Sequence, residues 1–196
     1  MEGLFFYWVS WIGWIIVTFF MNKSSTRTIL SYGLLSCIAL SNWKITVYSY
    51  EISGSYIVLL CFALGTSYYL SKLQNLYLMI MTLTVTAAFV AFHLFEMFDP
   101  IWIIAHRQWL LSGLMFILVW LMSDMFLQRV LSLVIGMCQG EWLYTMMLYR
   151  YSYYGTIGGL KFLDLLTAGL GFLFMLSLAE WMISSMKRYW TYSERQ

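Results

Sequence analysis

Long apolar runs separated by short polar connections divide the chain into seven segments. A helix rises 1.5 Å per residue, so about 20 apolar residues cross the hydrocarbon core of a bilayer. The pattern therefore predicts an all-α, polytopic transmembrane helix bundle of about seven spans, forming a single integral membrane domain over residues 1–196. The expected spans are approximately Leu4–Met21, Ile29–Val47, Ser55–Leu70, Leu76–Phe95, Gln108–Met122, Met125–Arg150 and Phe162–Ser185.

The connections between these spans are short, and none is long enough to form a soluble domain. We expect a loop at Tyr48–Gly54, a tight turn at Ser71–Asn75, and a loop rich in tyrosine and glycine at Arg150–Lys161. The second span is the weakest, because serines and Asn42 interrupt it. Whether that span crosses fully stays open at this stage.

The span Met125–Arg150 is the one around which we expect the bundle to be organised. Ser132, Gly136 and Gly140 recur every four residues, which places small side chains along one side of a helix. Such a seam allows close helix packing, and packing within the chain is favoured over dimerisation. Gln139 and Glu141 lie beside the seam, near the predicted middle of the membrane.

Composition and charge agree with a membrane protein. The chain is 62% hydrophobic and 10% charged, whereas soluble domains contain about 45–50% apolar and about 25% charged residues. The net charge of +2 is too small to suggest nucleic acid as a partner. The lipid bilayer, and other membrane proteins, are the partners that the sequence indicates. Three cysteines without CxxC spacing suggest neither a disulfide framework nor a zinc site.

Basic residues near the span ends predict the orientation, because they concentrate on the cytoplasmic side. With seven spans, one side receives seven Lys and Arg residues and the other receives four. This bias favours an outside N-terminus and a cytoplasmic C-terminus. If the second span does not cross, the tally becomes six against five.

Glu141 is the most distinctive candidate for function. A charge at the bilayer centre costs roughly 2.5–3.5 kcal/mol on insertion scales, so we expect the side chain to face the bundle interior. One interpretation is a proton or cation site, or an anchor for a polar substrate group. The other is a protonated glutamate that hydrogen-bonds to a neighbouring helix and stabilises the bundle.

A second group of candidates lies at the end of the fourth span and comprises His93, Glu96, Asp99 and His106. His93 and Glu96 share a helix face, and their side chains are of the types that bind zinc or transfer protons. Their spacing matches no metal motif, and no metal or cofactor is predicted. By helix rise, His93 lies about 9 Å and Glu141 about 13 Å inside the same boundary, so the two side chains are predicted to meet.

Two acids belong to the last span. Asp164 follows Lys161 by three residues, which predicts a local ion pair at the interface. Glu180 lies about 10 Å of helix before Lys187, and we expect it to pair with Arg129 or to extend toward the lipid headgroups.

The N-terminal sequence Met1-Glu2-Gly3-Leu4-Phe5-Phe6-Tyr7-Trp8, together with Trp11, Trp14 and the Lys23…Arg27 turn, resembles the YphA-type proteins. These are small multi-pass membrane proteins of spore-forming bacilli. The resemblance implies a bacterial cytoplasmic membrane as the location. It assigns no activity, and no functional residues can be transferred from it.

The leading hypothesis is a non-enzymatic partner or scaffold within a membrane assembly. The alternative is a small transporter or ion-coupled carrier that uses Glu141, with Gln139, His93 and Glu180 as further candidates. A weaker alternative is an intramembrane enzyme that uses His93, Glu96 and His106. The carrier hypothesis predicts that Glu141, His93 and Glu180 converge on one cavity.

Overall fold

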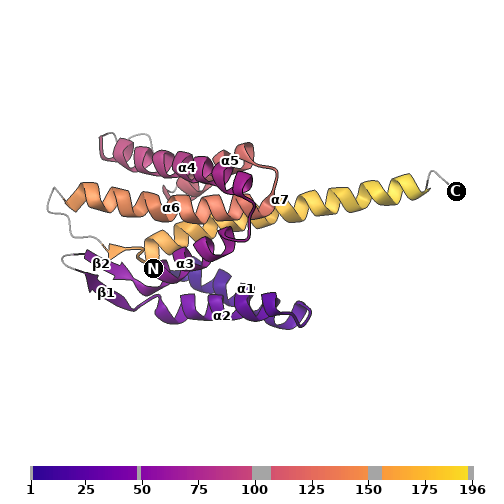
Figure 1. Ribbon diagram of the computed structural model, residues 1–196, viewed down its shortest axis with the longest axis horizontal. Helices are drawn as coiled ribbons and strands as arrows, with labels where there is room; N and C mark the ends of the chain where they lie inside the picture. The colour runs from indigo at the N-terminus through magenta and orange to yellow at the C-terminus, as the bar shows by residue number, and fades with distance from the viewer. Residues whose placement is uncertain (1, 48–49, 99–106, 150–155, 194–196) are drawn as a thin grey trace.

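Seven helices and a small sheet make up the part of the chain that the computed structural model describes, namely residues 2–47, 50–98, 107–149 and 156–193. Figure 1 shows the helices lying roughly along one long axis, with the sheet at one end of the bundle. The helices are α1 (Leu4–Phe20), α2 (Ser25–Leu40), α3 (Gly54–Ser67), α4 (Lys72–Phe98), α5 (Arg107–Met122), α6 (Phe126–Tyr149) and α7 (Leu160–Ser193). Each falls on one of the seven predicted spans.

In the described part of the chain, the bundle is all-helical, as predicted, apart from a small three-stranded sheet that the sequence did not predict. Strand β1 (Lys44–Val47) pairs antiparallel with β2 (Tyr50–Ser53), and β2 pairs in parallel with β3 (Thr156–Ile157). The second span was therefore predicted too long, because its last residues form β1. The Tyr48–Gly54 and Arg150–Lys161 segments, predicted as loops, contribute the other two strands. Ile157 is buried in this sheet, which ties the start of α7 to the hairpin that follows α2.

The predicted turn at Ser71–Asn75 is also wrong, because α4 already begins at Lys72. Ser71 and Gln74 explain the early start. The backbone N–H of Ser71 donates to Oε1 of Gln74 at 3.1 Å, and the N–H of Gln74 donates to Oγ of Ser71 at 3.5 Å. This reciprocal arrangement is a capping box, which satisfies N–H groups at a helix start.

The packing of α4 against α6 forms the centre of the bundle. A methyl group added at Gly136 would lie 2.6 Å from Cβ of Val85, and one at Gly140 would lie 2.7 Å from the ring of Phe89. Ser132, the third member of the seam, is fully buried. The predicted seam therefore lets the two helix backbones approach closely, and it does so within one chain.

The outer surface of the bundle is strongly apolar. Large side chains that point away from the core, more than half exposed, occur on several helices. They include Trp8, Ile12, Phe19, Met79, Ile80, Leu83, Met175 and Leu178. Contiguous apolar surface on this scale is unfavourable in water and is expected in contact with lipid.

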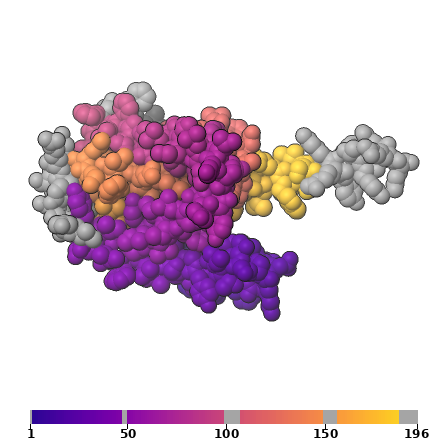
Figure 2. All heavy atoms as spheres, viewed as in Figure 1, coloured from indigo at the N-terminus to yellow at the C-terminus, as the bar shows by residue number. Residues whose placement is uncertain are grey.

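Two helices among the described residues are long and apolar enough to cross a membrane by length and composition. They are Lys72–Phe98, with mean hydropathy 2.0, and Leu160–Met186, with mean hydropathy 1.9. Leu4–Phe20, Gly54–Ser67 and Arg107–Met122 are shorter apolar helices. Figure 2 shows that α7 continues well past the rest of the bundle, at the end opposite the sheet.

Candidate ligand pocket

A pocket of about 380 Å³ lies at the sheet end of the bundle. Its inner part is formed by side chains from α4, α6 and α7, and its outer part by Glu2, Arg107 and Lys161. The inner residues include Phe89, His93, Glu141, Tyr144, Thr145 and Phe162. The volume lies within the range of small-molecule sites, which is about 300–1,000 Å³.

Glu141 lines this pocket next to a close contact between α4 and α6. Gly140 lets the Phe89 ring lie directly on the α6 backbone, and the next residue, Glu141, lines the pocket beside that ring. The backbone N–H of Gly158, in the turn before α7, interacts electrostatically with the Glu141 carboxyl group. The side chain is therefore held between α4 and α7, as predicted for an acid sheltered by neighbouring helices.

Gly158 is held in a conformation that favours glycine. Its φ is +69°, and a Cβ at this position would lie 2.4 Å from Cβ of Tyr56. Tyr56 in turn donates its hydroxyl to the carbonyl oxygen of Cys138 at 2.9 Å. The turn before α7, the middle of α6 and α3 are thus fixed against one another next to Glu141.

His93 is buried on α4, and its ring is fixed by its own helix. Nδ1 lies 3.0 Å from the carbonyl oxygen of Phe89, and the ring centroid lies 4.7 Å from that of Tyr144. A carbonyl oxygen only accepts hydrogen bonds, so Nδ1 carries the proton, and Nε2 is the acceptor of a neutral ring. His93 and Glu141, predicted to meet, line the same pocket.

The cations at the outer part of the pocket are paired with acids. Nε of Arg107 lies 2.9 Å from Oε1 of Glu96, and Nζ of Lys161 lies 3.1 Å from Oε1 of Glu2. Glu96, a sequence candidate, therefore has an ion-pair role. His106, the other candidate from this region, lies outside the described residues.

The predicted Lys161–Asp164 pair is wrong. Asp164 is buried and accepts hydrogen bonds from two backbone N–H groups at the start of α1, those of Gly3 at 2.6 Å and Phe6 at 2.8 Å. Lys161 instead pairs with Glu2. The spacing of three residues on one helix suggested that Lys161 and Asp164 pair with each other. In the structure, the partners of both residues lie near the N-terminus.

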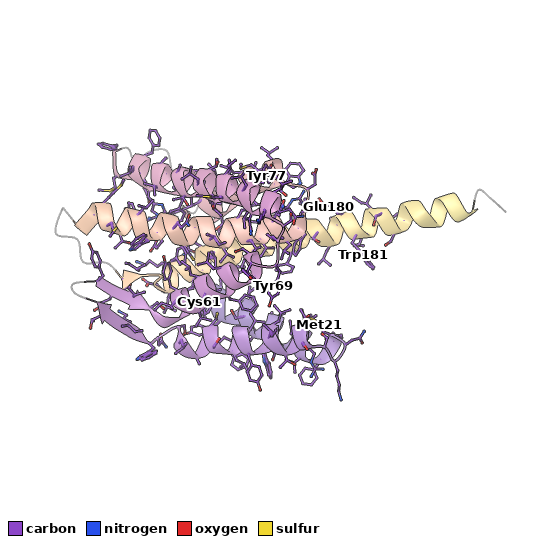
Figure 3. The ribbon with its side chains drawn as sticks, in the orientation of Figure 1. Met21, Cys61, Tyr69, Tyr77, Glu180 and Trp181 are labelled. Carbon is purple, nitrogen blue, oxygen red and sulfur yellow. The ribbon has the colours of Figure 1, made fainter. Side chains whose placement is uncertain are left out.

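Glu180 lies at the opposite end of the bundle. Its Oε1 is 3.3 Å from Nη1 of Arg129, so the predicted ion pair between α6 and α7 is confirmed. Figure 3 shows Glu180 and Trp181 where α7 leaves the bundle, far from the sheet. The predicted convergence of Glu141, His93 and Glu180 on one cavity is therefore wrong as regards Glu180.

Gln139 is exposed on α6, and its Oε1 accepts a hydrogen bond from Oγ1 of Thr86 at 3.2 Å. Among the residues that the structure describes, no group of three His, Cys, Asp or Glu side chains is placed to hold a metal ion.

Sequence reasoning did not assign Glu2, Arg107, Lys161 or Tyr144 to the site. They come from four separate segments, and only the tertiary fold brings them together.

The helices form a bundle whose outer surface is apolar, which is the arrangement of an integral membrane protein. A family model described as "YphA-like integral membrane protein" matches residues 2–196, and the chain belongs to this family. It is 31% identical over 188 residues to the Bacillus subtilis (strain 168) protein described as "Uncharacterized protein YphA", which covers 95% of this chain and 92% of that protein. No solved structure matches. The predicted family and the bacterial cell membrane as location are confirmed.

Proposed function

We propose that this protein is a non-enzymatic, multi-pass membrane protein that binds a small polar ligand in the pocket containing Glu141 and His93. The observation that supports this function is the placement of both side chains, from different helices, against one cavity of about 380 Å³. Ionisable groups within a membrane bundle are costly to bury and commonly mark ligand or ion sites. The predicted role as a partner in a membrane assembly is compatible with ligand binding and stays a prediction.

We further propose that all seven helices cross the membrane, with the N-terminus and the pocket outside and the C-terminus in the cytoplasm. The charge tally of seven against four supports this orientation. Figure 3 supports the alternation of the spans, because Met21 after α1 and Tyr69 after α3 lie at the same end as Glu180. Fusion of a reporter to the C-terminus tests the orientation, and an outside signal would overturn it.

Cysteine labelling in intact cells tests whether the pocket receives ligands from outside. Thr145 lines the pocket, and a cysteine side chain at this position has nearly the same volume as threonine. The background is Cys61→Ala, because Cys61 is exposed while Cys37 and Cys138 are buried. We expect a maleimide that cannot cross membranes to label Thr145→Cys but not the matched control Ser184→Cys, which lies beyond Trp181 on α7.

Each alternative result has a defined meaning. Labelling of Ser184→Cys alone in intact cells, with Thr145→Cys labelled only in opened membranes, would reverse the proposed orientation. Failure of Thr145→Cys to react in both preparations, while Ser184→Cys reacts in opened membranes, would overturn the ligand-binding function.

The second candidate function is a proton-coupled carrier, which the shared pocket of Glu141 and His93 favours. In proteoliposomes that contain a pH-sensitive dye, a carrier would dissipate an imposed proton gradient when its substrate is present. Glu141→Gln would abolish that flux while Glu51→Gln would not. A gradient that decays at the rate of empty vesicles across a panel of amines, carboxylates and sugars would exclude this function in favour of binding alone.

A further inference from the structure

The charge distribution in the pocket indicates what kind of ligand it accepts. We propose that the ligand is a small organic cation with an ammonium group, and that this group binds Glu141. The inference rests on the proposed ligand-binding function and adds the chemical class of the ligand.

The charged and titratable groups that line the pocket are Glu2, His93, Arg107, Glu141, Tyr144 and Lys161. Both permanent cations already have partners, because Arg107 pairs with Glu96 and Lys161 pairs with Glu2. Arg107 is near enough to interact electrostatically with Glu141. Among the described residues, however, no cationic side chain lies within 4.0 Å of the Glu141 carboxylate. In the described part of the chain, the inner part of the pocket therefore has an acid without a close ion-pair partner.

The neighbouring groups also require a donor from the ligand. His93 uses its Nδ1–H on the Phe89 carbonyl, which leaves Nε2 as a hydrogen-bond acceptor in the neutral ring. The N–H of Gly158 acts on the Glu141 carboxyl group, and a carboxylate has room for several donors. An ammonium group has up to three N–H donors and one positive charge, which complement these acceptors.

Aromatic rings surround the same acid. Phe89, Tyr144 and Phe162 line the pocket, and the Phe89 and Phe162 rings have centroids 6.4 Å apart in an edge-to-face arrangement. Aromatic faces attract organic cations, and a desolvated site strengthens that attraction. They also provide apolar area for the alkyl part of an amine. A carboxylate or phosphate ligand would instead be repelled by the ionised form of Glu141.

Three probes of equal chain length separate these possibilities, namely butylammonium, butyrate and butanol. Binding to the purified full-length protein is measured by isothermal titration calorimetry and by the shift of the thermal unfolding midpoint. We expect saturable binding of butylammonium only. Glu141→Gln is expected to weaken it about 30-fold, since loss of one partner from a buried charge pair has an effect of this size.

The matched control is Glu51→Gln, which removes an acid from the same end of the protein. Glu51 is half exposed, pairs with Lys44 at 2.9 Å and does not line the pocket. It should leave butylammonium affinity unchanged. Unfolding midpoints measured without ligand show that both variants are folded.

Other outcomes would overturn the inference. Binding of butyrate, or equal binding of all three probes, would exclude the ammonium class and leave the ligand-binding function intact. Absence of binding by any probe, with Thr145→Cys still labelled, would likewise reject the ammonium class alone. An unlabelled Thr145→Cys together with no binding would reject the pocket function as well.

Discussion

Among single residues, Asp164 makes the longest-range polar contact of the described part of the chain. Its two carboxylate oxygens accept the N–H groups of Gly3 and Phe6 across 161 and 158 positions of sequence. N–H groups in the first turn of a helix have no partner within that helix, and a negative charge there is stabilising. Asp164 therefore fixes the start of α1 to the first turns of α7.

Asp164→Asn tests this contact. The asparagine amide has one acceptor oxygen instead of two, so one of the two buried N–H groups loses its partner. The hydrogen bond that remains is weaker, because its acceptor is no longer charged. We expect the free energy of unfolding to fall by about 2 kcal/mol, measured by thermal or denaturant unfolding in detergent.

The matched control is Asp124→Asn. Asp124 is fully exposed and lies 3.9 Å from Nη2 of Arg129, so its replacement should leave the unfolding midpoint nearly unchanged. Equal effects of the two substitutions would contradict the capping role of Asp164.

The pair Arg129–Glu180 was predictable and the partners of Asp164 were not, for a physical reason. Successive spans run in opposite directions, so the start of one span and the end of the next lie on the same side of the membrane. An arginine near the start of α6 and an acid near the end of the membrane-crossing part of α7 therefore lie at similar depth. The partners of Asp164 are backbone N–H groups, which every residue carries, so no side-chain pattern identifies them. Short-range helix spacing then favoured Lys161, which was wrong.

At the scale of elements, the α4–α6 interface follows from one sequence pattern. Gly136→Ala places a methyl group 2.6 Å from Cβ of Val85 and 3.1 Å from the backbone oxygen of Thr82. Because backbone atoms cannot move aside without shifting a helix, we expect a loss of about 1–3 kcal/mol of stability. Thermal unfolding in detergent measures it.

Gly113→Ala on α5 is the matched control for this substitution. A Cβ at Gly113 meets nothing within 4 Å, and alanine favours a helix over glycine by up to about 1 kcal/mol. Its stability should be unchanged or slightly raised. A similar loss in both variants would contradict the close-packing explanation, because a Cβ at Gly113 meets no neighbouring atom.

All seven helices could be predicted because each is a long apolar run, and the sheet could not. Strands β1 and β2 contain four residues each and β3 contains two. Segments this short carry little periodicity, and β3 joins β2 only after four intervening helices. The seam was visible because small residues at intervals of four define one helix side, whereas its partner, α4, had to come from the structure.

At the scale of the whole molecule, the bundle and the end of α7 are separate parts. The 34 residues of α7 extend about 51 Å. Near the start of α6, α7 contacts that helix through Phe174, which packs on Phe126, and through Glu180, which pairs with Arg129. Trp181, Met182 and Ile183 are more than half exposed. The stability of the bundle should therefore depend on α7 only as far as Glu180.

Two truncations test this division. A chain that ends after Ile183 retains Glu180, and we expect its unfolding midpoint to equal that of the full chain. A chain that ends after Ala179 removes Glu180, so among the described residues the buried Arg129 keeps only the exposed Asp124, at 3.9 Å, as an acidic partner. We expect a lower midpoint, because a buried charge that loses a close partner is destabilising. Thermal unfolding of both purified proteins measures the difference. Equal midpoints for the two truncated chains would contradict the role of this ion pair.

The pocket also belongs to this largest scale, because five separate segments form it. Its two inner ionisable residues were candidates from sequence, since an acid and a histidine in apolar runs are conspicuous. From sequence, Arg107 was only a marker of orientation, Lys161 was in addition the predicted partner of Asp164, and Glu2 was only part of the N-terminal sequence. Residues at the ends of helices meet according to how the helices are arranged, which the pattern of each helix alone does not determine.

The contact between Asp164 and the start of α1 has a consequence for biosynthesis. A ribosome makes α1 before the other described helices and reaches residue 164 only after α6, so α1 is made long before its acceptor exists. Through most of translation the amide groups at its start must be satisfied by water or lipid headgroups. Attachment of the N-terminus is therefore a late event in assembly, and a nascent chain that stops before α7 cannot complete it.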